Sequence, residues 1–130
     1  MATDPMPKSI ATVGQFKKAL ISVRDNGLPT AYLEMLQAQC RAPDSAITAT
    51  QLAKTAGYQN YNAANLHYGK LASNIAGYLG FSPELRSDGT PRWWTTLSYS
   101  PDASNDPETG HFRFFMRPEL ITALREMRWA

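Results

Sequence analysis

The sequence contains one cysteine, two histidines and no long apolar run, and each shortage excludes a class of protein. Cys40 has no second cysteine to pair with, so no internal disulfide can hold the fold. Together with His67 and His111 it supplies too few and too scattered ligands for a structural zinc site, so we expect no metal and no other cofactor. No stretch is long enough to cross a bilayer, and the first ten residues lack the apolar block of a secretion signal. We therefore expect a cytoplasmic protein with no membrane partner.

Catalytic signatures are also missing. The chain has no Gly-rich phosphate loop, no paired-histidine metal motif and no nucleophile with a recognisable base beside it. We therefore expect no enzyme. Its 130 residues and 43% apolar content fit one globular domain with one core, and we expect residues 1–10 to form a flexible N-terminus.

Charge is distributed unevenly, although the net charge is only +2. No aspartate or glutamate lies between Asp44 and Glu84, whereas Lys54, His67 and Lys70 do, so the middle of the chain is locally positive. A Pro/Ser/Asn-rich segment, expected to be a surface loop, holds the acids Asp102, Asp106 and Glu108. This asymmetry permits nucleic-acid binding by the middle of the chain.

Apolar residues at helical spacing predict helices over about 12–25, 29–42, 48–56 and 60–79, and a last helix from Pro118. Thr48 and Gln51 have the spacing of a capping box, and Gly57 stands where a helix ends in a left-handed residue. Residues 58–60 then form a short polar turn into the next helix. The segment 48–79 is therefore predicted to be a helix-turn-helix. Glycines within its second helix, Gly69 and Gly77, suggest close packing against another element.

Two alternating segments predict a hairpin after these helices. Trp93, Thr95, Leu97 and Tyr99 alternate as in a half-buried strand, which puts Trp93 and Trp94 on opposite faces. Phe112, Phe114 and Met116 alternate likewise, with 101–110 as the connecting loop. Helices followed by a hairpin and a closing helix predict a mainly α fold with a small β-hairpin, a winged helix-turn-helix over residues 1–130.

In a helix-turn-helix the start of the second helix enters the major groove of DNA. Asparagine and glutamine side chains pair with adenine, and basic side chains contact phosphate or guanine. The candidate DNA-binding residues are Gln59, Asn60, Asn62, Asn65, His67 and Lys70, with Arg113 and Arg117 from the hairpin stem. A plainer interpretation stays open, in which the asparagines only cap the helix, His67 is a surface residue and the arginines are solvated.

Several stretches together carry a resemblance to a known family: 47–53 with Gly57 and Tyr58, then 65–71, Trp94 and 116–120. They resemble a bacterial domain that occurs alone or ahead of an HNH nuclease domain in proteins predicted to be restriction endonucleases. The resemblance implies a double-stranded DNA recognition module of restriction or phage defence, acting with a separate nuclease or defence-complex partner. Two histidines do not suffice for an HNH centre in this chain.

The acidic segment favours a second hypothesis. Phosphates repel Asp102, Asp106 and Glu108, so this loop is not expected to lie on DNA. Such a loop imitates phosphates instead, as in an inhibitor encoded by a phage or mobile element that binds a defence complex, in the manner of an anti-CRISPR protein. Both hypotheses use the same helix-turn-helix fold.

Overall fold

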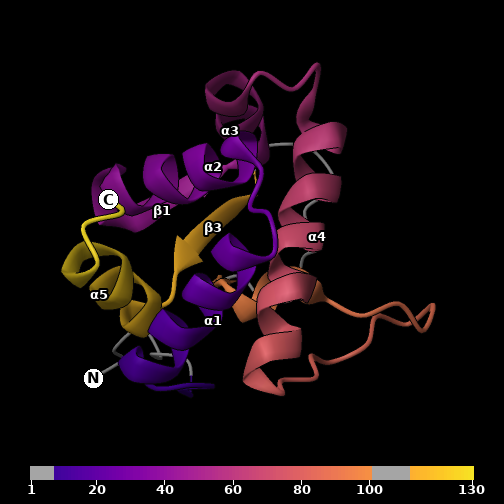
Figure 1. The fold of residues 1–130 in the computed structure, drawn as a ribbon. Helices are drawn as coiled ribbons and strands as arrows, with labels where there is room; N and C mark the ends of the chain where they lie inside the picture. Colours follow the sequence, from indigo (N-terminus) through magenta and orange to yellow (C-terminus); the bar gives the residue numbers. More distant parts are fainter. Residues whose placement is uncertain (1–7, 101–111) are drawn as a thin grey trace, which may run out of the picture.

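The computed structural model describes residues 8–100 and 112–130, and this part of the chain is mainly helical with one small antiparallel sheet (Figure 1). Its α-helices are α1 (Val13–Asp25), α2 (Thr30–Arg41), α3 (Ala49–Ala56), α4 (Tyr61–Leu79) and α5 (Pro118–Glu126). Its strands are β1 (Ala46–Thr48), β2 (Ser98–Tyr99) and β3 (Arg113–Met116), and its two 3₁₀ helices are η1 (Pro43–Ser45) and η2 (Trp93–Thr96). The predicted mainly helical class with a small sheet is confirmed.

Local signals in the sequence define the helix ends. The side chain of Thr48 accepts from the Gln51 amide, and the Gln51 side chain accepts from the Thr48 amide, which confirms the capping box of α3. Thr12 and Gln15 form the same arrangement at the start of α1. Gly57 has φ 79°, so the predicted left-handed end of α3 is confirmed.

The sheet has the order β1-β3-β2, and its first strand was not predicted. Ile47 lies opposite Phe114 in the antiparallel pair of β1 and β3, whereas the sequence predicted only the helix that starts at about residue 48 and no strand before it. A strand of three residues is too short to display an alternating pattern, and its partner lies far along the chain. Only the pairing with β3 identifies it.

The predicted strand over residues 93–99 is wrong in its first half. Residues 93–96 form the 3₁₀ helix η2, in which the Thr95 and Leu97 amides donate to the carbonyl oxygens of Arg92 and Trp94. Trp94, Thr96 and Leu97 are buried, while Trp93 is only partly buried. Packing of η2 against α4 therefore overrides the alternating pattern, and only residues 98 and 99 form β2.

One face of α4 is buried in the core. Ala64, Tyr68, Leu71 and Ile75 are almost completely inaccessible, as their helical spacing predicted. Tyr68 is held by hydrogen bonds as well as by packing, because its hydroxyl donates to Gln39 Oε1 at 2.6 Å and lies within hydrogen-bond distance of Ser98 Oγ. Burial raises the pKa of Tyr68, so the phenol stays neutral inside the fold.

One further expectation is wrong. A Cβ placed on Gly69 or Gly77 meets no atom within 4 Å, so close packing does not explain either glycine. The flexible N-terminus expected over residues 1–10 stays a prediction; of that segment, the carbonyl oxygen of Lys8 accepts a hydrogen bond from the Arg117 guanidinium at 3.1 Å. Residues 1–7 and the acidic loop with Asp102, Asp106 and Glu108 lie outside the described residues.

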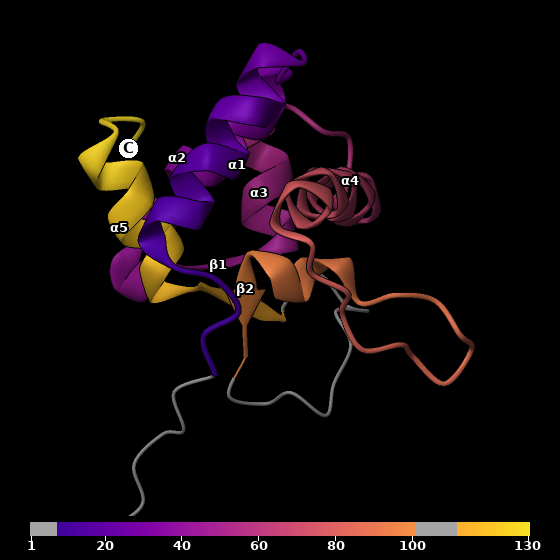
Figure 2. The ribbon, with the colours of Figure 1, turned by 60° about the horizontal axis from the view of Figure 1, so that its bottom comes forward.

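The segment 81–92 projects from the body of the molecule beyond the end of α4 (Figure 2). It folds back on itself as a short hairpin-like finger, with a bridge between Leu85 and Pro91. The Arg86 amide donates to the Thr90 carbonyl oxygen at 2.7 Å, and the Arg86 guanidinium donates to the Pro91 carbonyl oxygen at 2.8 Å. We call residues 81–92 the finger.

Candidate nucleic-acid interface

The N-terminal half of α4 presents an exposed ridge. Asn62, Leu66 and Lys70 follow one another at intervals of four residues, and all three are exposed, Leu66 by 57%. Neither Asn62 nor Lys70 makes a hydrogen bond or ion pair with residues 8–100 or 112–130, so both are available to a partner. Gly69, whose missing side chain leaves the helix backbone open, lies between them on the same surface.

At the start of α4 one predicted residue caps the helix, and two others are exposed without a capping role. Asn60 is the N-cap, and its Oδ1 accepts from the Ala63 amide at 3.0 Å. Gln59 is exposed in the turn before it. The structure therefore gives Asn60 a structural role, while Gln59 and Asn62 remain accessible at the end of the helix that a DNA groove receives in a helix-turn-helix.

His67 lies on another side of α4 and contacts two tyrosines. Its Nδ1 is 2.8 Å from the hydroxyl of Tyr32 on α2, and its ring stacks on Tyr58 of the turn with centroids 4.7 Å apart. Desolvation by burial raises the pKa of both tyrosines. The histidine thus joins α2, the turn and α4, and the structure does not bring it into the ridge of Asn62 and Lys70.

The two hairpin arginines have different environments. Arg113 is exposed on β3 with its guanidinium carbon 5.0 Å from the centre of the Phe115 ring. Arg117 is only 6% exposed, and its guanidinium donates to the carbonyl oxygens of Thr95 and Lys8. Burial lowers the pKa of Arg117. The expectation that Arg117 contacts a DNA backbone is therefore wrong, because its donors face the interior.

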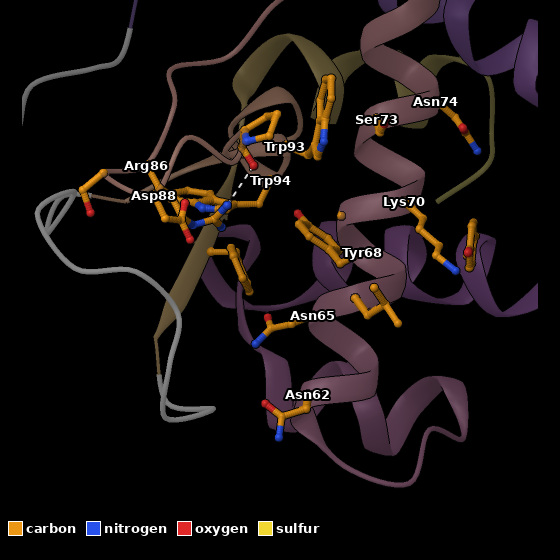
Figure 3. A pocket seen from close by; sticks show the side chains of 16 residues that line it. Asn62, Asn65, Tyr68, Lys70, Ser73, Asn74, Arg86, Asp88, Trp93 and Trp94 are labelled. Carbon is orange, nitrogen blue, oxygen red and sulfur yellow. Dashed lines mark hydrogen bonds between the residues drawn. The ribbon is translucent and has the colours of Figure 1, made fainter.

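A groove of about 870 Å³ runs between α4, the finger and η2 (Figure 3). Asn62 and Asn65 extend from α4 on the side of Arg86 and Asp88, whereas Lys70 extends from the opposite side of the helix. Trp94 also lines the groove. Of the predicted residues, Asn62 and Asn65 thus extend toward the finger, a neighbour that the sequence did not indicate, and Lys70 belongs to the lining from the other side of α4.

The finger carries one carboxylate on its tip. Asp88 accepts from the amide and the hydroxyl of Thr90 at 2.9 and 2.6 Å, and these hydrogen bonds lower the pKa of Asp88. No aspartate or glutamate lies between Asp44 and Glu84, so α4 carries no negative side chain. Asparagine amides and Lys70 give the ridge a polar to positive character, while the mouth of the groove at Asp88 is negative.

Comparisons with protein-family models, curated proteins and solved structures find no match for this chain. The resemblance to domains linked to HNH nucleases therefore stays a prediction. Within residues 8–100 and 112–130, no group of three or more His, Cys, Asp or Glu side chains is arranged to hold a metal ion. Nor does any helix there combine the length and apolar character needed to cross a membrane.

Proposed function

We propose that this protein is a winged helix-turn-helix that binds double-stranded DNA through the N-terminal half of α4. The observation that carries the proposal is the ridge of Asn62, Leu66 and Lys70, which is exposed and free of carboxylates. An amide reads adenine in the major groove, an apolar side chain contacts the thymine methyl group, and an ammonium neutralises a phosphate. The ridge therefore carries one group for each kind of contact.

The arrangement of the elements supports the same proposal. The short turn after Gly57 connects α3 to α4, as in the two helices of a helix-turn-helix. Around them the chain follows the order α2, β1, α3, α4, β2, β3 and α5, and β3 pairs with both other strands. This is the order expected of a winged helix, in which β2 and β3 form the stem of the wing.

The biological setting is a proposal that rests on the resemblance alone. In that setting the protein recognises DNA in restriction or phage defence, and a separate nuclease or defence-complex partner acts on it. The inhibitor hypothesis depends on Asp102, Asp106 and Glu108, which lie outside the described residues. The exposed ridge on α4 supports DNA as the partner.

A salt series with a fluorescent duplex of mixed sequence tests the proposal. We expect the Lys70→Ala variant to lose affinity for all sequences and to lower the slope of log K against log salt by about 1, because one phosphate contact is lost. Asn62→Ala is expected to relax the preference at one base pair by about 1–3 kcal/mol in a selection from random duplexes. Lys18→Ala removes an exposed lysine from α1 and is the matched control.

Two results contradict the proposal. One is the absence of duplex binding by the unaltered protein at low salt. The other is binding that Lys70→Ala and Lys18→Ala weaken equally, because the affinity then comes from net charge rather than from α4. Neutralising Asp102, Asp106 and Glu108 supplies a further arm, since loss of a co-purifying protein partner would favour the inhibitor hypothesis.

A further inference from the structure

A residue that lines the groove between α4 and the finger carries a buried donor with no acceptor among residues 8–100 and 112–130. Trp94 is only 6% exposed, yet its indole Nε1 makes no hydrogen bond with the described part of the chain. Buried tryptophan N–H groups usually have a partner, because an unsatisfied buried donor is costly. Trp94 belongs to the lining of the groove. The Nε1 atom itself has almost no accessible surface, so a ligand in the groove would satisfy this donor by displacing the atoms that cover it.

The 3₁₀ conformation of η2 brings a second indole to the same groove. Successive residues of a 3₁₀ helix are about 120° apart, so neighbouring side chains can share one surface, whereas neighbours in a strand point to opposite faces. Trp93 and Trp94 both line the groove, and in Figure 3 they lie between α4 and Asp88 of the finger. Trp93 is only partly buried and has an accessible aromatic surface.

The remaining lining is polar and contains two cations, Lys70 and Arg86, and one carboxylate, Asp88. Asn62 and Asn65 of α4 carry amides that both donate and accept. Arg86 already donates to the Pro91 carbonyl oxygen, and Asp88 stands at the mouth. A planar ring with carbonyl or ring-nitrogen acceptors matches the indole surface and the amides.

We infer that the groove between α4, the finger and η2 binds a single unpaired nucleobase, which stacks on Trp93 and accepts a hydrogen bond from the Trp94 indole. The groove volume of about 870 Å³ lies within the range of roughly 300–1,000 Å³ typical of sites for small organic molecules. The base comes either from a DNA duplex that lies on α4, which rests on the proposed function, or from a free nucleotide. An already unpaired base is favoured because no stacking energy has to be spent on extruding it.

The test compares a fully paired duplex, the same duplex with one central unpaired base, and the matching mononucleotide. Fluorescence anisotropy measures the two duplexes, and the indole N–H resonances of ¹⁵N-labelled protein report on all three ligands. We expect the unpaired base to tighten duplex binding about tenfold, as one aromatic–base stack would. We also expect the Trp94 indole resonance to move downfield, as a new hydrogen bond requires.

Trp93→Ala removes the stacking surface, so it should abolish the tenfold preference and leave the paired duplex unchanged. Trp94→Phe keeps a ring in the core and removes only the N–H, so it should reduce the preference without abolishing it. Trp129→Phe is the matched control, since Trp129 does not line the groove. The indole resonances of the unaltered protein keep the inference testable if Trp94→Phe does not fold.

The outcomes separate the two proposals. Equal affinity for both duplexes with an unmoved Trp94 resonance overturns the inference and leaves duplex recognition by α4 intact. A Trp94 resonance that shifts with the mononucleotide, in a protein that binds no duplex, supports the groove as a nucleotide site and overturns the proposed function. A tenfold preference that survives Trp93→Ala overturns the inference, because the preference then arises outside the groove.

Discussion

The two long faces of α4 differ in what their side chains contact. On the buried face Tyr68 is packed against β3 and hydrogen-bonded to Gln39 and Ser98. On the exposed face Asn62 and Lys70 make no hydrogen bond or ion pair with the described part of the chain. All three residues lie within one stretch of nine positions, 62–70. One helix thus serves the core and presents a surface, because a period of 3.6 residues separates the two sets of side chains.

The comparison predicts a clean separation of effects. A substitution on the buried face should change the free energy of unfolding and leave affinity unchanged, as long as the protein is folded. A substitution on the exposed face should do the reverse. Three changes test or sharpen this separation, in order of their expected size.

Tyr68→Phe tests the buried face. It removes a hydroxyl with two buried partners and leaves Gln39 and Ser98 without it, so we expect a loss of about 1–3 kcal/mol in the free energy of unfolding. Urea denaturation measures this loss. The matched control is Tyr78→Phe on the exposed part of the same helix, where the hydroxyl accepts a hydrogen bond from Asn26. Equal losses in the two variants would contradict the importance of the buried network.

Asn60 lies at the boundary between the two faces, as the N-cap of α4. Asn60→Ala should lower the free energy of unfolding by about 1 kcal/mol, because the Ala63 amide loses its acceptor. Asn60→Ser restores a capping oxygen and should recover most of that stability, measured by thermal unfolding. If Asn60→Ser also retains full DNA affinity, Asn60 acts only as a cap. A loss of affinity in Asn60→Ser alone would instead place Asn60 among the base-reading residues.

The pair Gly69→Ala and Gly77→Ala separates an effect on stability from an effect on DNA affinity. Both positions are helical with open space around them, so each alanine should raise the free energy of unfolding by about 0.4–1 kcal/mol. Only Gly69 lies on the ridge with Asn62 and Lys70, and a methyl group there would separate α4 from a closely approaching duplex. We expect Gly69→Ala to be more stable but weaker in DNA binding, and Gly77→Ala to be only more stable. Equal affinities would show that DNA does not approach Gly69.

Much of the helical framework followed from the sequence. The predicted capping box at Thr48 and the left-handed Gly57 each involve residues within a few positions of one another, so their hydrogen bonds are encoded locally. The capping box at Thr12 is equally local, but it was not predicted. The spacing of Ala64, Tyr68 and Leu71 likewise predicted the buried face of α4, and by elimination the exposed one. The candidate residues Asn62 and Lys70 were instead chosen from their place in the second helix of a helix-turn-helix and from the base- and phosphate-binding chemistry of their side chains.

The errors concern segments whose partners are distant. Trp93 and Thr95 alternate like strand residues, yet packing against α4 curls them into a 3₁₀ helix. Arg117 is a charged residue of a type usually found at the surface, yet its guanidinium donates to the carbonyl oxygens of Lys8 and Thr95 and is buried. The prediction that Gly69 and Gly77 allow close packing was also wrong, because a Cβ placed on either residue meets no atom within 4 Å.

The sequence by itself determined the helices, their ends and the carboxylate-free middle of the chain, because caps, turns and periodicity depend on neighbours in the chain. Only the tertiary structure decided the pairing of β1 with β3, the burial of Arg117 and the groove between α4 and the finger. Each of these depends on contacts between segments far apart in the sequence. The same distinction applies to Trp94, whose aromatic character is visible in the sequence but whose unsatisfied donor exists only because the fold buries it.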